Sequence, residues 1–101
     1  MLNLEIRLVT MYAVYVLYSP TINKFYIGST SDLEKRIYYH NNGKSPYTRN
    51  KGPWVVVYQE SYRAREDAIR RERELKNWKS SKRMIASLGI DINLYDGSSP
   101  G

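Results

Sequence analysis

Cysteine is absent from this 101-residue chain, which also has only one histidine and one phenylalanine. Without cysteine there are no disulfide bonds and no thiolate metal sites, and a single histidine excludes a histidine-rich zinc site. No apolar run approaches the roughly 20 residues that are needed to cross a membrane. The N-terminal stretch lacks the apolar core and the small-residue cleavage site of a signal peptide. We therefore expect a cytoplasmic protein with no membrane-spanning segment.

The charge of the chain is unevenly distributed. The net charge is +6, and lysine and arginine clearly outnumber the acidic residues between positions 63 and 83. Clustered positive charge favours a polyanionic partner, most often nucleic acid, although a solvated helix face has the same composition. With 42% hydrophobic and 26% charged residues, the composition is that of one ordinary globular domain.

The first half of the chain predicts a β-hairpin. Residues 11–19 form a nearly continuous apolar run rich in valine and tyrosine, which is typical of a central strand buried on both faces. Turn residues at 20–24 separate this run from a second strand at 25–29. Five residues are too few for a parallel crossover, so the two strands are expected to be antiparallel.

A helix, a third strand and two more helices are predicted after the hairpin. Ser31 and Glu34 fit a capping box that opens a helix over residues 32–42, and Gly43 ends it. Residues 54–60 have the β-branched and aromatic character of a strand, and helices are predicted at 63–78 and 80–89. The fold class is α/β (α+β), with a three-stranded antiparallel sheet flanked by helices in the order ββα(α)βαα. One domain is expected over residues 11–89, with an extension at 1–10 and a flexible tail at 90–101.

Gly28 and the abundance of tyrosine are hard to explain by packing alone. Glycine weakens a strand interior, so Gly28 indicates a bulge or the close approach of another group. Two of the ten tyrosines, Tyr15 and Tyr26, lie on the two strands of the predicted hairpin, where their rings could meet. Phenylalanine would serve packing without a hydroxyl group to satisfy, so these phenols suggest a role beyond packing.

Glu72 lies on the apolar side of the predicted 63–78 helix. It is four residues after Ala68 and three before Leu75, and side chains three or four apart share a helix face. A carboxylate at such a position is costly unless it is paired or bound to metal. The alternatives are an ion pair with Lys76 or a place at the wet edge of the apolar stripe.

Arg36 and His40 lie four residues apart and project from one side of the predicted 32–42 helix. Arg36 flanks the apolar side of this helix, where an arginine fork suits a phosphate group. The alternative is structural, with Arg36 paired to Asp32 on the surface and His40 near the surface at the helix end.

The series of these residues resembles the GIY-YIG nuclease family, in particular its short, stand-alone bacterial members. These are related to the N-terminal nuclease domain of a bacterial excinuclease and to the nuclease domains of some homing endonucleases. The first family tripeptide corresponds to Ala13-Val14-Tyr15 and the second to Tyr26-Ile27-Gly28. Arg36, "HNNGK" at 40–44, "YTR" at 47–49 and "AIRRERELK" at 68–76 follow in order, so the resemblance covers roughly residues 12–83.

The resemblance implies a small antiparallel sheet with helices and hydrolysis of phosphodiester bonds with one divalent metal ion, Mg²⁺ or Mn²⁺. Glu72 would be the sole protein ligand of the metal, and Arg36 would neutralise the scissile phosphate. Tyr15 and Tyr26 would position or deprotonate the attacking water, with His40 assisting. Ionising a phenol at pH 7 costs on the order of 4 kcal/mol, so the phenols could instead only orient water.

The resemblance also gives expectations about the substrate. The expected substrate is nucleic acid, DNA rather than RNA, and structured or damaged DNA of repair or recombination, with the protein acting as a monomer. Further residues are expected to contact nucleic acid: Gly28, Ser29, Lys44, Thr48, Arg49, Arg71 and Lys76. Two departures from the family are Ala13 in place of glycine and Ser29 where some relatives have lysine. The alternatives are a nucleic-acid-binding module that does not cut and a protein-interaction adaptor.

Overall fold

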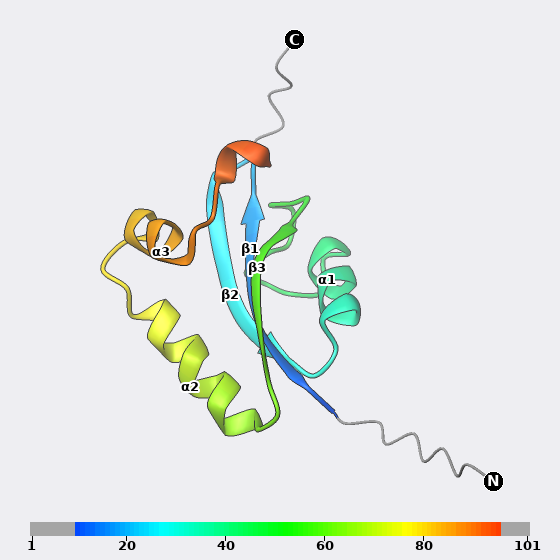
Figure 1. Ribbon diagram of the computed structural model, residues 1–101. Coiled ribbons are helices and arrows are strands. Elements are labelled where there is room, and N and C mark those ends of the chain that lie inside the picture. The colour runs from blue at the N-terminus through cyan, green and yellow to red at the C-terminus, as the bar shows by residue number, and fades with distance from the viewer. Residues whose placement is uncertain (1–9, 96–101) are drawn as a thin grey trace, which may run out of the picture.

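The computed structural model describes residues 10–95, which form one three-stranded sheet with helices packed on both sides (Figure 1). The elements are β1 (Tyr12–Ser19), β2 (Lys24–Thr30), α1 (Leu33–Asn41), β3 (Val55–Tyr62), α2 (Arg65–Lys76), α3 (Ser81–Leu88) and the 3₁₀ helix η1 (Ile92–Leu94). The order ββαβαα confirms the predicted fold class. Most of the expected N-terminal extension and residues 96–101 of the expected tail lie outside the described residues.

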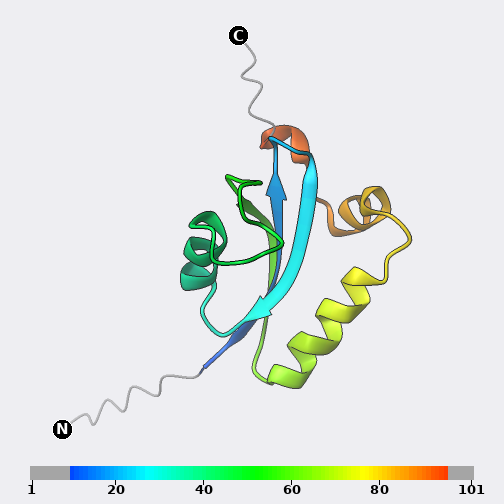
Figure 2. The ribbon, with the colours of Figure 1, turned by 180° about the vertical axis from the view of Figure 1, so that it is seen from behind.

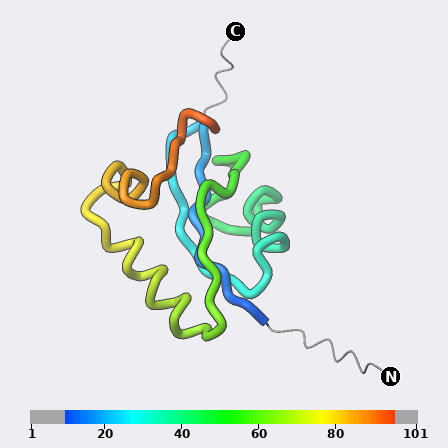
Figure 3. The backbone as a smooth tube through the Cα atoms, in the orientation of Figure 1, coloured from blue at the N-terminus to red at the C-terminus, as the bar shows by residue number. Residues whose placement is uncertain are grey.

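The three strands are ordered β2-β1-β3 and every pairing is antiparallel. Figures 2 and 3 show β1 between its two neighbours. Residues Val14 to Ser19 of β1 are all buried, as predicted for a central strand covered on both faces. The register of the hairpin places Tyr15 opposite Gly28 and Leu17 opposite Tyr26.

Each face of the sheet has its own apolar cluster, because alternate residues of a strand point to opposite faces. Val14 and Val16 pack with Ala68, Leu75 and Met84 on the side that α2 and α3 cover. Tyr15, Leu17 and Trp54 form the second cluster, on the side of α1. Figures 1 and 2 show this division, with α1 on one side of the sheet and α2 and α3 on the other. One strand therefore serves both halves of the core.

The start of α1 differs from the prediction. The N-cap is Asp32 rather than Ser31, since the Asp32 carboxylate accepts a hydrogen bond from the Lys35 amide at 3.1 Å. The Thr30 hydroxyl accepts from the Asp32 amide at 3.1 Å, which holds the chain out of the helix one residue longer. Gly43 adopts a φ of 72° just after α1, in agreement with the predicted helix end.

The later helices agree with the sequence at α3 and differ at the tail. Ser80 caps α3 by accepting from the Arg83 amide, and Gly89 ends it with a φ of 71°. Residues 42–54 form turns, bends and irregular chain, so the bracketed helix of the predicted order ββα(α)βαα is absent from this segment. Part of the expected tail is regular, because Asp91 caps the 3₁₀ helix η1. No helix in the described part of the chain is long and apolar enough to span a membrane.

Candidate active site

Three aromatic residues predicted to act together lie in contact on the α1 side of the sheet. The ring centroids of Tyr15 and Tyr26 are 6.4 Å apart, and those of Tyr26 and His40 are 4.6 Å apart. The Tyr15 hydroxyl lies 3.1 Å from Nε2 of His40. Tyr15 comes from β1, Tyr26 from β2 and His40 from the last turn of α1. The structure therefore joins these side chains from three elements into one cluster.

Gly28 makes room for this cluster. A Cβ atom at Gly28 would lie 2.7 Å from Cζ of Tyr15 and would also overlap the Tyr15 hydroxyl. Such a contact is far inside van der Waals distance, so any other residue at this position would displace the ring. The close approach predicted from the glycine is that of Tyr15, whose partner in the strand register is Gly28 itself.

Burial sets the protonation of Tyr15 and His40. Burial raises the pKa of the Tyr15 phenol far above its usual value, Tyr26 and Glu72 raise it further, and Arg36 lowers it. Burial lowers the pKa of His40, and the neighbouring charge of Arg36 lowers it further. At neutral pH the phenol keeps its proton, and the imidazole is neutral and able to accept one. The charges of Arg36 and Glu72 thus both act on the pKa of the Tyr15 phenol, in opposite directions.

Glu72 reaches the end of β2 from α2. Its Oε1 accepts a hydrogen bond from the Ser29 hydroxyl at 2.6 Å, and its Oε2 lies 2.6 Å from Nζ of Lys76. The Glu72 side chain is only 21% exposed. The structural alternative of an ion pair with Lys76 is therefore present, and Ser29 positions the same carboxylate.

Arg36 is exposed on α1, and its guanidinium lies 5.5 Å from the ring centroid of Tyr39. The carboxylate of Asp32, its alternative partner, caps the helix at the Lys35 amide. Arg36 lines a cavity of about 400 Å³ together with Ser29 and with Arg65, the first residue of α2. Arg65 was not among the predicted residues. Its spacing from Ala68 and Glu72 on one helix face is the signal that could have identified it.

The remaining residues predicted to contact nucleic acid have different environments. Lys44 and Arg49 are exposed in the loop after α1. Thr48 is only 1% exposed, and its hydroxyl lies 2.9 Å from Nδ1 of His40. The Arg71 guanidinium binds the carboxylates of Glu60 and Glu74. Thr48 and Arg71 therefore have partners within the protein that the sequence did not indicate.

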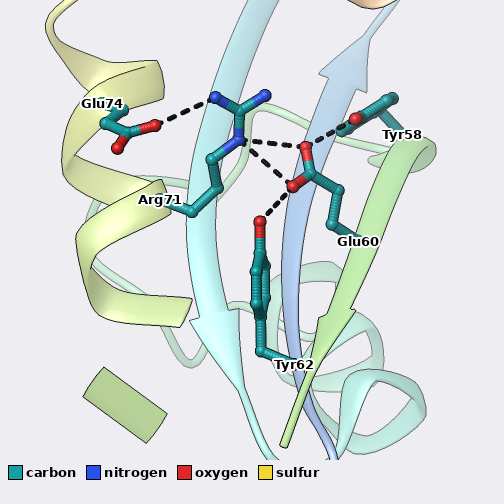
Figure 4. Close-up of polar contacts among 5 residues, drawn as sticks. All are labelled: Tyr58, Glu60, Tyr62, Arg71 and Glu74. Carbon is teal, nitrogen blue, oxygen red and sulfur yellow. Dashed lines mark hydrogen bonds and ion pairs between the residues drawn. The ribbon is translucent and has the colours of Figure 1, made fainter. Parts of the chain in front are cut away.

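Arg71 belongs to a polar network between α2 and β3 (Figure 4). Its Nε lies 3.1 and 3.2 Å from the two carboxylate oxygens of Glu60. The hydroxyls of Tyr58 and Tyr62 also donate to Glu60. Burial tends to raise the pKa of Glu60, but hydrogen bonds from the two tyrosines and Arg71 outweigh it and hold the pKa below its usual value. The network fixes the helix that carries Glu72 to an edge strand.

The Glu72 carboxylate is an oxygen ligand of the kind that a hard divalent cation takes. Within residues 10–95 no group of three or more histidine, aspartate or glutamate side chains gathers into a metal cage. Mg²⁺ commonly takes one or two carboxylates and keeps several water ligands, so a lone glutamate satisfies its requirements. The ammonium of Lys76 occupies one of the carboxylate oxygens, which a bound cation would have to share or displace.

The residues of the candidate site lie within a segment that matches a known protein family. The family profile described as the GIY-YIG catalytic domain matches residues 11–84, which is most of the chain. The chain belongs to the GIY-YIG family. Both GIY-YIG tripeptides lie on the central hairpin, where Val14 and Tyr15 of β1 pair with Ser29 and Gly28 of β2. The GIY-YIG family is one of nucleases, so membership implies a nucleic acid partner.

Several short GIY-YIG relatives are similar to this chain. It is 40% identical to the UPF0213 protein of Staphylococcus haemolyticus over 63 residues, 61% of this chain and 77% of the relative. It is 39% identical to the UPF0213 protein of Haloquadratum walsbyi over 70 residues, 67% of this chain and 79% of the relative. The solution NMR structure of the UPF0213 protein of Bacillus halodurans is 32% identical, with a TM-score of 0.48 over 87% of this chain and 88% of that one.

Proposed function

We propose that this chain is a cytoplasmic, monomeric endonuclease that hydrolyses phosphodiester bonds in DNA with one divalent ion, Mg²⁺ or Mn²⁺. The observation that supports this most is the convergence of Tyr15, Tyr26 and His40 in one cluster. In addition, Arg36 lines one cavity with Ser29, whose hydroxyl donates to Glu72. The substrate we propose is structured or damaged DNA, of the kind that arises in repair or recombination.

The two phenols orient the attacking water, and His40 takes its proton. Burial raises the pKa of Tyr15, so almost no phenolate is present at neutral pH to act as a base, and the neutral hydroxyl holds the water. His40 is neutral at pH 7, and its Nε2 lies 3.1 Å from the Tyr15 hydroxyl. Tyr15 passes its own proton to Nε2 as it takes one from the water, so the phenol is neutral before and after the step. The Tyr26 ring packs against the His40 ring, and its hydroxyl is proposed to help orient the same water.

Arg36 and Glu72 together offset the negative charge of the phosphate, Arg36 directly and Glu72 through a divalent ion. Arg36 lines the cavity beside Ser29, where its guanidinium can bind two phosphate oxygens. Glu72 would hold the divalent ion, which when bound stabilises the charge that develops on the phosphate. Ser29 keeps the carboxylate oriented through its hydrogen bond. Lys44, Arg49 and Lys76 are proposed to lie along the path of the nucleic acid, whereas Gly28 is buried beneath Tyr15.

A second candidate is a module of nuclease fold that binds nucleic acid and does not cut it. The observation that favours it is the engagement of both Glu72 oxygens, one by Ser29 and one by Lys76. A carboxylate satisfied in this way needs no metal. The two candidates differ in whether a divalent ion can displace Lys76 when substrate is bound.

Incubation with a panel of substrates separates the two candidates. Purified protein is mixed with Mg²⁺ and plasmid, single-stranded DNA, branched DNA or RNA, with and without EDTA. We expect cleavage of at least one DNA substrate, which EDTA abolishes and Arg36→Ala lowers by about 10²-fold. Arg70→Ala is the matched control, because Arg70 pairs with Asp67 on the exposed side of α2. Binding to every substrate with cleavage of none would support the second candidate.

A further inference from the structure

Thr48 has a position that a contact with nucleic acid does not explain. It lies in the loop after α1, is only 1% exposed, and its hydroxyl is 2.9 Å from Nδ1 of His40. His40 is itself 2% exposed, and its other ring nitrogen faces the Tyr15 hydroxyl at 3.1 Å. Tyr15, His40 and Thr48 thus form one buried line of hydrogen bonds across 33 residues of sequence.

We propose that Thr48 is a positioning residue that holds His40 as the tautomer protonated on Nδ1, which leaves Nε2 free to accept the proton of Tyr15. The proposal rests on the proposed function for its consequence in catalysis. The tautomer itself is a property of the folded chain without substrate or metal.

One assignment of donors and acceptors gives each group in this line of hydrogen bonds the role that suits it best. A neutral imidazole carries a single N–H, and the hydrogen bond made at one nitrogen decides the role of the other. A phenol is a stronger donor than an aliphatic alcohol, and an imidazole nitrogen is a good acceptor. Tyr15 therefore donates to Nε2, and the N–H at Nδ1 donates to the oxygen of Thr48.

The Thr48 hydroxyl can donate its own hydrogen while its oxygen accepts from Nδ1 of His40. His40 and Thr48 both line a polar cavity of about 520 Å³ beside the loop, together with Asn50 and Gly52. A hydroxyl at the edge of such a cavity can accept from Nδ1 and still donate to a water molecule. The arrangement leaves no buried hydrogen without an acceptor.

The loop holds Thr48 firmly enough to act in this way. The Thr48 carbonyl accepts from the indole N–H of Trp54 at 3.0 Å, and Trp54 is 4% exposed. The amide and carbonyl of Trp54 are bound in turn by the side chain of Asn41 at the end of α1, at 2.7 and 3.1 Å. β-Branching restricts the χ1 angle of threonine as well. The hydrogen bond at the Thr48 carbonyl and the restricted χ1 angle together fix the Thr48 hydroxyl relative to the His40 ring.

The experiment is long-range ¹H–¹⁵N NMR of the imidazole, which is unambiguous because the chain has one histidine. In the wild type at pH 7.5 we expect Nδ1 to resonate as a protonated nitrogen and Nε2 as an unprotonated one. In Thr48→Val, which keeps the shape and loses the hydroxyl, we expect the Nδ1–H tautomer to lose at least half of its population. Thr48→Ser restores the hydroxyl and should retain the wild-type tautomer.

A further variant shows which neighbour decides the tautomer. Tyr15→Phe removes the other hydrogen bond of the ring. The Thr48 hydroxyl can still donate its own hydrogen to water in the cavity and accept from Nδ1, so Nδ1 should remain protonated. A wild type protonated on Nε2, or a loss of the Nδ1–H tautomer in Tyr15→Phe, would overturn the proposal. These two spectra decide the matter even where Thr48→Val does not fold, which its circular dichroism reveals.

Cleavage assays connect the tautomer to activity. The kcat of Thr48→Val is expected to fall about 10-fold, with KM unchanged, while Thr48→Ser stays near the wild type. A tautomer that depends on Thr48 in a protein that cleaves no substrate would contradict the proposed function and uphold the role of Thr48. If the protein cleaves DNA but the His40 tautomer is the same in Thr48→Val as in the wild type, the proposed function would be upheld and the role of Thr48 contradicted.

Discussion

Gly28 and Tyr15 are paired across the central hairpin, and the absence of one side chain makes the position of the other possible. The Tyr15 ring lies over the Gly28 backbone, and its hydroxyl reaches His40. A glycine that weakens a strand is kept here because the ring of the facing tyrosine fills its space. The pair explains why the strand that opens the site contains glycine where a β-branched residue would be more stable.

Gly28→Ala is expected to destabilise the protein by about 1–3 kcal/mol, because the new methyl group overlaps the Tyr15 phenol. Urea denaturation measures the change. The cost should shrink in a Tyr15→Leu background, where the phenol is gone. An equal cost of Gly28→Ala in both backgrounds would mean that Tyr15 is not the obstacle.

Tyr26→Phe is expected to lower cleavage by about 10²-fold while the free energy of unfolding changes by about 0.5 kcal/mol or less. The phenyl ring keeps its packing against His40 and Tyr15, so only the hydroxyl is lost. Cleavage rate and urea denaturation are measured on the same preparation. Tyr38→Phe, at a residue 66% exposed, is the control. Equal rates for Tyr26→Phe and the wild type would remove Tyr26 from the chemistry.

His40 makes the stability depend on pH in a defined direction. Its pKa is lowered in the folded state by burial and by Arg36, so the unfolded chain binds a proton more readily. The free energy of unfolding should therefore fall as pH drops below about 6.5, with a slope of at most about 1.4 kcal/mol per pH unit. Urea denaturation between pH 8 and 5 measures it, and His40→Gln should remove the slope in this range. A stability that rises on acidification would contradict the assignment.

At the scale of elements, α2 is the helix on which the site depends most. One face packs Ala68 and Leu75 against the sheet, and the same helix directs Glu72 toward Ser29. Arg71, next to Glu72, ties the helix to Glu60 of β3. The position of the candidate metal ligand is thus fixed by an apolar contact on one strand and a charged network on another.

Arg71→Ala is expected to cost about 1–3 kcal/mol of stability, because it leaves the half-buried Glu60 carboxylate without its cationic partner. Arg70→Ala, one residue away, removes an exposed pair with Asp67 and should change stability by no more than about 0.5 kcal/mol. Thermal or urea denaturation of the two variants makes the comparison. If Arg71→Ala weakened DNA binding with stability unchanged, Arg71 would be a nucleic acid contact, as its sequence context predicted.

At the scale of the whole molecule, the sequence predicted the sheet, but not the contacts that hold the candidate residues in place. The Val- and Tyr-rich run of β1 predicted a central strand because burial on both faces leaves a continuous apolar pattern. The spacing of Glu72 in an apolar stripe indicated a partner, and the structure gives it Ser29 and Lys76.

Most of the contacts that hold the candidate residues in place join distant segments of the chain, which local sequence patterns do not encode. Thr48 binds His40 because an irregular loop folds back over the end of α1, and no periodicity describes that path. Glu60 and Arg71 meet only after β3 and α2 have packed together. The N-cap of α1 is Asp32 rather than the predicted Ser31, because the Asp32 amide donates to the Thr30 hydroxyl and lies outside the helix. The first two outcomes are decided by tertiary structure, and the third by local hydrogen bonds between side chains and backbone.

The central claim is that one glutamate on α2 serves a metal-dependent phosphodiesterase, and Glu72→Gln tests it most directly. The cleavage rate of a DNA substrate is measured against Mg²⁺ concentration for the wild type, Glu72→Gln and the exposed control Glu66→Gln, prepared identically. We predict that Glu72→Gln loses at least about 10²-fold in rate at every Mg²⁺ concentration, while Glu66→Gln matches the wild type. Cleavage by Glu72→Gln at the wild-type rate would contradict the account and point to a contaminating nuclease.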